Sequence, residues 1–249
     1  MKPYALIFAA GLGTRLKPLT DTMPKALVPV DGVPLLERVI TRLKGAGYSN
    51  IVINAHHFAE QIIDFIEQKE SFGISVAISD ERDLLRETGG GIRHAAPLLK
   101  SDHFLVHNVD IISDLDLPLF EEKYLEAERE YKNCERPLLA TILVSERKTQ
   151  RFFLFDDSNN LVGWTNIATG EVRSPFPGLN PDKFRKLAFA GIHNISKRVF
   201  PLMEKWPERF PIVDFYIANC GKYLIKGIEV PGLSIRDVGK ISDLNSLKY

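Results

Sequence analysis

Two glycines, an arginine and a lysine lie close together near the N-terminus, in the stretch AAGLGTRLKPLTDTMPKALVPV at residues 9–30. Gly11 and Gly13 have no side chain, so backbone N–H groups there can approach a phosphate closely. Arg15 offers a planar fork of donors for phosphate oxygens, and Lys25 offers a mobile point charge. These residue types at this spacing predict a loop that binds a phosphorylated ligand. Alternatively, the glycines only turn the chain and the two cations are ordinary surface charges.

Two better-known glycine motifs do not fit this stretch. The dinucleotide-binding fingerprint requires a third glycine, and Leu16 stands at that position. The P-loop requires Gly-Lys followed by Ser or Thr, which does not occur here. The pattern that remains is G-x-G-x-R with a later Pro-Lys.

The phosphate-binding candidate follows an apolar segment, and similar segments recur through the first half of the chain. Strand-like segments alternate there with segments whose apolar residues have helical spacing. This alternation predicts an α/β fold with a doubly wound, mainly parallel sheet, in which ligands bind at the carboxyl ends of the strands. The expected strands are residues 4–9, 50–55, 74–80 and 103–110, and the expected helices are residues 33–47, 58–69 and 89–100.

The second half of the chain mixes the two kinds of element. A hairpin is expected at residues 151–164, around the turn-rich DDSNN, and a loop at residues 169–184. No internal repeat or low-complexity linker divides the chain, which predicts a single domain with a small appended β-rich lobe. The other expected elements are helices at 117–133 and 211–221, and strands at 137–145, 185–196, 222–230 and 233–239.

Composition excludes several classes of function. The chain of 249 residues has 32 Lys and Arg against 32 Asp and Glu, so no overall basic field would attract nucleic acid or a membrane surface. No apolar run approaches the roughly 18 residues of a membrane span. The two cysteines, Cys134 and Cys220, are far apart and have no metal-binding spacing. A reduced, cytoplasmic setting is therefore expected.

Residues 9–40 as a whole resemble the signature of the sugar-phosphate nucleotidyltransferases. The resemblance continues through RETGGGIRHAAPLL, NVDIISD and FAGIHN to IRDVGKISDL, in the same order and over nearly the whole chain. It is strongest to a short bacterial branch that includes N-acetylmuramate 1-phosphate uridylyltransferases and mannose-1-phosphate guanylyltransferase-like proteins. The resemblance implies a Rossmann-like nucleotidyltransferase domain over residues 1–249, with a nucleotide-binding half at 1–115 and a sugar-phosphate-binding half at 116–249.

The resemblance also implies roles for individual residues. Arg15 and Lys25 are the expected catalytic cations, with Lys25 reaching the α-phosphate of a nucleoside triphosphate. The stretch RETGGG is the expected base pocket, although Thr88 could also serve as a helix cap. The residues expected to bind the nucleotide are Ala10, Gly11, Gly13, Thr14, Glu87, Thr88, Gly89, Gly90 and Asn108.

Two aspartates are the expected ligands of Mg²⁺, because this ion prefers a few carboxylate oxygens and keeps several waters. The family places one after the fourth strand and one near the C-terminus, which match Asp110 and Asp237. For Asp110, a turn or helix cap is the alternative. On the acceptor side, Gly191 resembles the backbone contact to the sugar. Asp214 is expected to accept a sugar hydroxyl or, alternatively, to be an ordinary exposed helical acid.

Three departures from the family pattern concern the same regions. Val109 replaces a glycine that many relatives carry before the metal aspartate, and Lys240 replaces a small or hydroxyl residue. Many relatives also have Glu-Lys-Pro after the hairpin, whose lysine holds the sugar phosphate. Here the stretch is GWTNIA, so Lys183, Arg185 or Lys186 would have to substitute.

The predicted reaction joins a nucleoside triphosphate, UTP or GTP, to a sugar 1-phosphate and releases pyrophosphate. N-acetylmuramate 1-phosphate is the favoured acceptor, and mannose- or heptose-type phosphates remain open. A regulatory subunit of the same fold that binds nucleotides but is catalytically weak is the alternative from another class. The partners expected are therefore these two small molecules, without nucleic acid or membrane. The sequence leaves the oligomeric state open.

Overall fold

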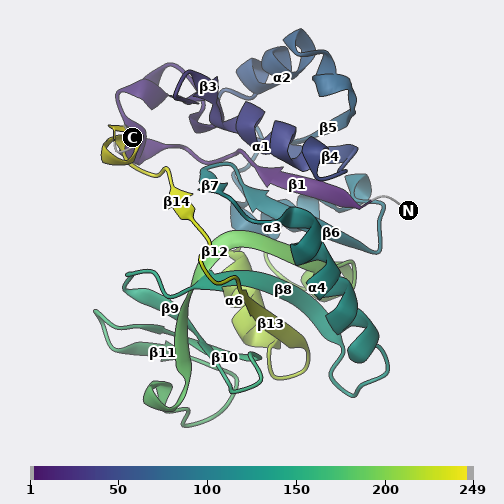
Figure 1. Cartoon of the computed structure of the whole chain (residues 1–249), viewed down its shortest axis with the longest axis vertical. Coiled ribbons are helices and arrows are strands. Elements are labelled where there is room, and N and C mark those ends of the chain that lie inside the picture. Colours follow the sequence, from purple (N-terminus) through teal and green to yellow (C-terminus); the bar gives the residue numbers. More distant parts are fainter. Residues whose placement is uncertain (1–2, 246–249) are drawn as a thin grey trace.

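The computed structural model describes residues 3–245, and its centre is a ten-stranded mixed sheet (Figure 1). Along its main path the strand order is β11-β10-β9-β12-β6-β1-β4-β5, and β13 and β8 join the sheet beside β12. The strands are β1 Tyr4–Phe8, β4 Asn50–Ala55, β5 Ser75–Asp80, β6 His103–Asn108, β8 Leu138–Ser145, β9 Arg151–Phe155, β10 Leu161–Asn166, β11 Glu171–Arg173, β12 Arg185–Ser196 and β13 Leu224–Glu229.

Four strands of the N-terminal half are parallel, as the alternating pattern predicts. β1 lies between β4 and β6, and β5 pairs with β4, all in parallel register. The α/β prediction is thereby confirmed. The helices are α1 Leu35–Gly45, α2 Ala59–Gln68, α3 Glu87–Ala95, α4 Leu117–Glu130, α5 Val199–Met203, α6 Ile212–Asn219 and α7 Ile241–Asn245.

The sheet is covered on both faces, which explains why its central strands are almost continuously apolar. In β1, the side chains of Ala5 and Ile7 enter one hydrophobic cluster, which includes residues of α1, α2 and α4. Leu6 points the other way into a second cluster with residues of α3, α5 and α6. Side chains alternate between the two faces of a strand, so each face needs its own apolar set.

The β-rich lobe is continuous with this sheet through the long strand β12. The N-terminal part of β12 pairs with β9, and its C-terminal part pairs with β6. The expected loop at residues 169–184 is wrong in part, because β11 within it pairs antiparallel with β10 and extends the hairpin to three strands. In Figure 1 the lobe hangs below the parallel strands.

Two small sheets lie outside the main one. β2 Pro29–Val30 pairs with β3 Val33–Pro34, next to the start of α1. β7 Ile111–Ser113 pairs antiparallel with β14 Ile235–Asp237. The second pairing returns the C-terminal segment, yellow in Figure 1, to the carboxyl end of β6. None of the helices in residues 3–245 has the length and apolar character that crossing a bilayer requires.

Candidate active site

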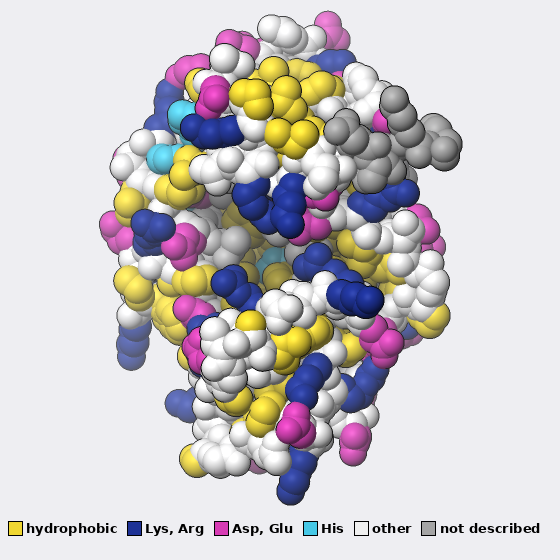
Figure 2. All heavy atoms as spheres, turned by 90° about the vertical axis from the view of Figure 1, so that its left-hand side faces the viewer, with side chains coloured by type: hydrophobic (Ala, Val, Ile, Leu, Met, Phe, Trp, Pro, Cys, Tyr) yellow, Lys and Arg dark blue, Asp and Glu magenta, His cyan; other side chains and the backbone are white. Residues whose placement is uncertain are grey.

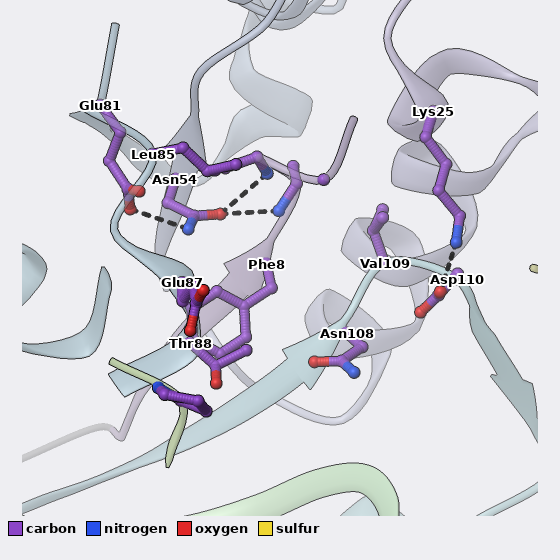
Figure 3. A pocket seen from close by; sticks show the side chains of 14 residues that line it. Phe8, Lys25, Asn54, Glu81, Leu85, Glu87, Thr88, Asn108, Val109 and Asp110 are labelled. Carbon is purple, nitrogen blue, oxygen red and sulfur yellow. Dashed lines mark hydrogen bonds and ion pairs between the residues drawn. The ribbon is translucent and has the colours of Figure 1, made fainter. Parts of the chain in front are cut away.

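A cavity of about 400 Å³ opens at the carboxyl ends of the parallel strands (Figure 3). Seven residues that the sequence singles out line it: Ala10, Gly11, Lys25, Glu87, Thr88, Asn108 and Asp110. Val109, the departure from the family pattern, lies among them, and its side chain is almost fully buried. The remaining lining residues are Phe8, Ala9, Asn54, Glu81, Leu85 and Pro211.

Asn54 and Glu81 line this cavity and hold its backbone in place through hydrogen bonds. The Asn54 side chain accepts hydrogen bonds from the backbone N–H groups of Ala9 and Ala10, at 2.7 and 3.2 Å. Its amide nitrogen donates to Glu81 Oε1 at 2.9 Å, and the other oxygen of Glu81 accepts from the Arg86 N–H. Glu81 has no solvent exposure. These contacts fix the stretch predicted to bind phosphate, residues 9–30 and from here the phosphate-binding loop, against the loop after β5 (Figure 3).

The phosphate-binding loop makes a tight turn after this anchor. A Cβ on Gly11 would have no neighbour within 4 Å, and the Gly11 N–H donates to no described residue. Gly13 has φ +62°, and a Cβ there would lie 2.8 Å from the methyl group of Thr20. Only glycine satisfies both demands at position 13, the positive φ and the close approach. Thr14 follows in a short 3-10 turn, outside the cavity lining.

The two expected metal ligands lie next to each other although 127 positions separate them. Asp237 pairs with Ile111 across β14 and β7, and the Val238 N–H donates to the Asp110 carbonyl at 2.8 Å. Arg15 reaches the same place, since its Nη2 would lie 2.9 Å from a Cβ on Gly239. The chain therefore brings Asp237 and Arg15 to the strand end that carries Asp110, a residue of the cavity lining.

The two carboxylates have different partners. Lys25 Nζ forms an ion pair with Asp110 Oδ2, and both side chains are largely buried (Figure 3). Asp237 Oδ2 lies 3.7 Å from Arg147, whereas its Oδ1 is buried and has no hydrogen-bond partner. An unpartnered buried carboxylate oxygen is a suitable ligand for a divalent cation. Within the described residues no three Asp, Glu, His or Cys side chains form a metal cluster.

The stretch expected to hold the base is positioned by contacts with the segment before α6. Glu87 begins α3 with φ +59°, and its carboxylate pairs with Arg209 at 3.0 Å. Thr88 does not cap this helix. Its hydroxyl instead accepts the Ile212 N–H at 2.8 Å, which ties α3 to α6.

Gly89 and Gly90 pack against the segment before α6, and neither lines the cavity. Both N–H groups donate to the Phe210 carbonyl, at 2.8 and 3.2 Å, and a Cβ on Gly89 would overlap the Phe210 ring. In this structure the two glycines therefore allow close packing. The expected backbone contact with a nucleobase stays a prediction.

The two residues expected on the acceptor side are placed differently. Gly191 lies in a bulge of β12 with φ +75°, and a Cβ there would lie 2.6 Å from the Asn108 amide nitrogen. It therefore sets the position of a cavity-lining side chain. Asp214, on α6, forms an ion pair with Arg173 at 2.5 Å and does not line the cavity.

Two buried histidines lie in the strands beneath the site. Burial lowers the pKa of His107, on β6, to about 4. Burial, with a contribution from His107, lowers the pKa of His193 on β12 to about 3. His193 shares a hydrogen bond of 2.6 Å with the Tyr216 hydroxyl. Both rings are therefore neutral at neutral pH.

Asn54 and Glu81 are the functional residues that sequence reasoning missed. Each is a polar residue at the end of an apolar strand, in NIVINA and ISVAISDE, where a buried side chain needs partners. That position is the signal that could have identified them. On the surface, Lys and Arg side chains border a hollow between the upper and lower parts of the molecule (Figure 2). Positive charge thus gathers locally on a chain of zero net charge.

Comparison with known proteins supports an assignment to a family. The chain is 46% identical over 112 residues to N-acetylmuramate alpha-1-phosphate uridylyltransferase of Neisseria meningitidis, covering 45% of this chain and 48% of that protein. It is 44% identical over 110 residues to the enzyme of the same name from Caulobacter vibrioides, covering 43% and 46%. The matched segments thus span about half the length of these curated relatives.

The fold has close counterparts among solved structures. The crystal structure of HddC from Yersinia pseudotuberculosis, complexed with GMP-PN, superposes with a TM-score of 0.73 over 98% of this chain and 97% of that one, at 21% identity. The sequence model described as nucleotidyl transferase matches residues 4–153, more than half of this chain. That match contains the phosphate-binding loop, Lys25 and Asp110, which contribute to the lining of the cavity. The chain therefore belongs to the nucleotidyl transferase family.

Proposed function

We propose that the protein is a sugar 1-phosphate nucleotidyltransferase, which joins a nucleoside triphosphate to a sugar 1-phosphate and releases pyrophosphate. The observation that carries this proposal is the contact between Lys25 and Asp110 at the edge of the cavity, beside Asp237. A cationic, glycine-rich loop thus meets Asp110, and the pairing of β14 with β7 brings the backbone of Asp237 next to that residue. UTP and N-acetylmuramate 1-phosphate are the favoured substrates, because the Neisseria and Caulobacter relatives carry that activity in their names.

The reaction forms one bond and breaks one bond. An oxygen of the sugar 1-phosphate bonds to the α-phosphorus, and the bond from that phosphorus to the bridging oxygen of pyrophosphate breaks. The electron pair leaves with pyrophosphate. A phosphate monoester has a second pKa of about 6, so the attacking oxygen is already deprotonated near neutral pH. The protein therefore needs to supply positioning and charge neutralisation rather than a general base.

The residues of the cavity can supply both. Lys25 would neutralise the α-phosphate, and Arg15 would add a second, permanent positive charge. Asn54 holds Ala9 and Ala10, so the Gly11 N–H remains available to a phosphate oxygen. Rigid donors cost no reorganisation when negative charge develops during the reaction.

Asp110 and Asp237 would hold Mg²⁺, which when bound neutralises part of the triphosphate charge. Their fit to the ion rests on the buried, unpartnered Oδ1 of Asp237 and on the pairing that brings the two residues together. In the protein without ligands, Lys25 compensates the charge of Asp110.

A pyrophosphate-release assay tests the proposal directly. Four nucleoside triphosphates are crossed with the 1-phosphates of N-acetylmuramate, N-acetylglucosamine, glucose and mannose, in Mg²⁺ and in EDTA. We expect turnover with UTP and N-acetylmuramate 1-phosphate that EDTA abolishes and added Mg²⁺ restores. Turnover with GTP and mannose 1-phosphate would instead identify a guanylyltransferase. Nucleotide binding without turnover on any pair would favour the regulatory alternative.

The Asp110→Asn variant separates the metal assignment from general damage to the fold. We expect it to lose at least 10²-fold in turnover, as when a group that stabilises transition-state charge is removed. The matched control is Asp64→Asn, an exposed carboxylate on α2, which should leave turnover unchanged. An active Asp110→Asn protein would exclude Asp110 from the metal site.

A further inference from the structure

A second, smaller cavity lies beside Asp237, between the lobe and β12. Its volume is about 200 Å³. Three aromatic side chains line it, together with two arginines and two smaller residues: Phe153, Trp164, Phe189, Arg147, Arg151, Thr149 and Val213. None of the residues expected from the sequence to bind substrate lines this cavity.

The charges of this cavity are unbalanced. Arg147 donates to the Phe189 carbonyl at 3.1 Å and lies 3.7 Å from Asp237 Oδ2, so it joins the cavity to the carboxylate pair. The Arg151 guanidinium has no ion pair or hydrogen bond with any residue from 3 to 245. No Asp or Glu lines the cavity. Two guanidinium groups over an aromatic wall suit a ligand with an anionic group and an apolar face.

The aromatic wall is itself held in place by charge. The Arg173 guanidinium stacks on Trp164, 4.0 Å from the ring centroid, and its charge is balanced by Asp214 and Glu171. Asp214 therefore contributes to the wall of this cavity through Arg173. A buried indole held rigidly in this way is a suitable surface for the C–H face of a sugar ring.

The position of Arg151 also bears on the missing Glu-Lys-Pro lysine. Arg151 lies directly opposite Asn166 in the antiparallel pairing of β9 and β10, at the end of the hairpin where GWTNIA replaces that motif. Two of the cations expected as substitutes are already engaged. Arg185 pairs with Glu229 at 2.7 Å and Lys186 pairs with Asp182 at 2.6 Å.

We propose that Arg147 and Arg151 bind the phosphate of the sugar 1-phosphate acceptor, and that Trp164 contacts its sugar ring. This inference rests on the proposed function and names the acceptor site within it. Because Arg147 also contacts Asp237, a phosphate on the two arginines lies next to the carboxylate pair, beside the triphosphate. The attacking oxygen of the sugar 1-phosphate would then approach the α-phosphorus from the side of the lobe. Pyrophosphate would leave on the side of the phosphate-binding loop.

Kinetics with separate titration of the two substrates test the assignment. Arg151→Gln should raise KM for the sugar 1-phosphate by about 10- to 100-fold, the range for a lost charge-assisted contact, and leave KM for the nucleotide within twofold. Arg147→Gln should raise the same KM and also lower kcat, because Asp237 loses its neighbour. Arg129→Gln, an exposed cation on α4, is the matched control and should change neither constant.

A binding measurement keeps the test independent of turnover. The chain has two tryptophans, so Trp206→Phe leaves Trp164 as the sole indole reporter in the cavity wall. Its fluorescence is titrated in EDTA with N-acetylmuramate 1-phosphate, glucose 1-phosphate and inorganic phosphate, with and without UTP. A saturable change that Arg151→Gln weakens at least tenfold supports the assignment, even if no substrate pair turns over and the proposed function fails.

Two results would overturn the assignment while leaving the proposed function intact. In the first, an active enzyme has acceptor KM values and Trp164 titrations that are the same in Arg147→Gln, Arg151→Gln and Arg129→Gln. In the second, the arginine variants raise KM for the nucleotide and not for the acceptor, which would place the triphosphate rather than the sugar phosphate on these cations.

Discussion

Replacing Lys25 by methionine tests stability and catalysis at the same contact. Methionine keeps the unbranched stem that packs beside Gly13 and removes the charge paired with Asp110. The Lys25 side chain is 10% exposed and that of Asp110 is 19% exposed. Removing one partner of a fully buried pair costs about 3–5 kcal/mol. Because Asp110 keeps some contact with water, we expect the metal-free variant to lose about 2–3 kcal/mol of unfolding free energy.

The loss of kcat/KM should exceed what a smaller folded fraction of the variant would cause. Lost neutralisation of a developing charge typically lowers kcat/KM by about 10² to 10³, or about 3–4 kcal/mol. Urea unfolding gives the stability change, and pyrophosphate release gives kcat/KM on folded protein. Mg²⁺ should reduce the stability difference between variant and wild type, since a cation at Asp110 replaces the missing charge, but it should not restore turnover.

Lys17→Met is the matched control in the same loop. Its side chain is 61% exposed and pairs with Asp21 at 3.0 Å, so the change should cost no more than about 0.5 kcal/mol. The reasoning is refuted if Lys25→Met keeps kcat/KM within threefold of wild type. An unchanged unfolding free energy in EDTA would refute the structural half, because Asp110 would then not depend on Lys25.

Three further predictions concern the support of the site. Asn54→Ala removes the partner of two backbone N–H groups and of one buried carboxylate oxygen, Glu81 Oε1, and should cost about 3–5 kcal/mol by urea unfolding. Asn50→Ala on the same strand should cost under about 1 kcal/mol. The pKa of His193 is about 3 in the folded protein and about 6.5 in the unfolded chain. Between these two pH values the unfolded chain binds one more proton than the folded protein. Stability should therefore fall by about 2 kcal/mol from pH 7 to pH 5 through this group, and His193→Gln should flatten that dependence; an unchanged slope would contradict it. Gly191→Ala should lower the unfolding free energy by about 1–3 kcal/mol and raise KM for the nucleotide. Gly170 has φ +74° but no close neighbour, so Gly170→Ala should show the cost of backbone strain alone.

The sequence predicted the parallel half of the fold well because its signals are local. A strand buried on both faces is a continuous apolar run, and each of the four ended within two residues of its expected position. β11 was missed because three residues, Glu171–Arg173, are too few to reveal a strand pattern, and two of them are exposed. Its strand conformation comes from pairing with β10, which a local pattern does not contain.

The candidate site was predictable where residue type determines chemistry. Lys25 and Asp110 both line the cavity, and their expected roles toward the α-phosphate and Mg²⁺ stay predictions. The packing of Gly89 against Phe210 could not be predicted, since a glycine indicates a close approach without indicating the neighbour. Arg151 could not be found at all from its surroundings in the chain. Its proposed role depends on the cavity that it lines together with Arg147, whose guanidinium lies 3.7 Å from Asp237, 90 positions later in the chain.

The pairing of β14 with β7 has a consequence for biosynthesis. Asp110 emerges from the ribosome well before Asp237, yet the second carboxylate reaches the first only through the pairing of Asp237 with Ile111. A nascent chain can therefore form the parallel strands and the phosphate-binding loop while it still lacks half of the carboxylate pair. If both carboxylates are needed, incomplete chains cannot consume nucleotide, and activity appears only in molecules whose translation has passed this strand.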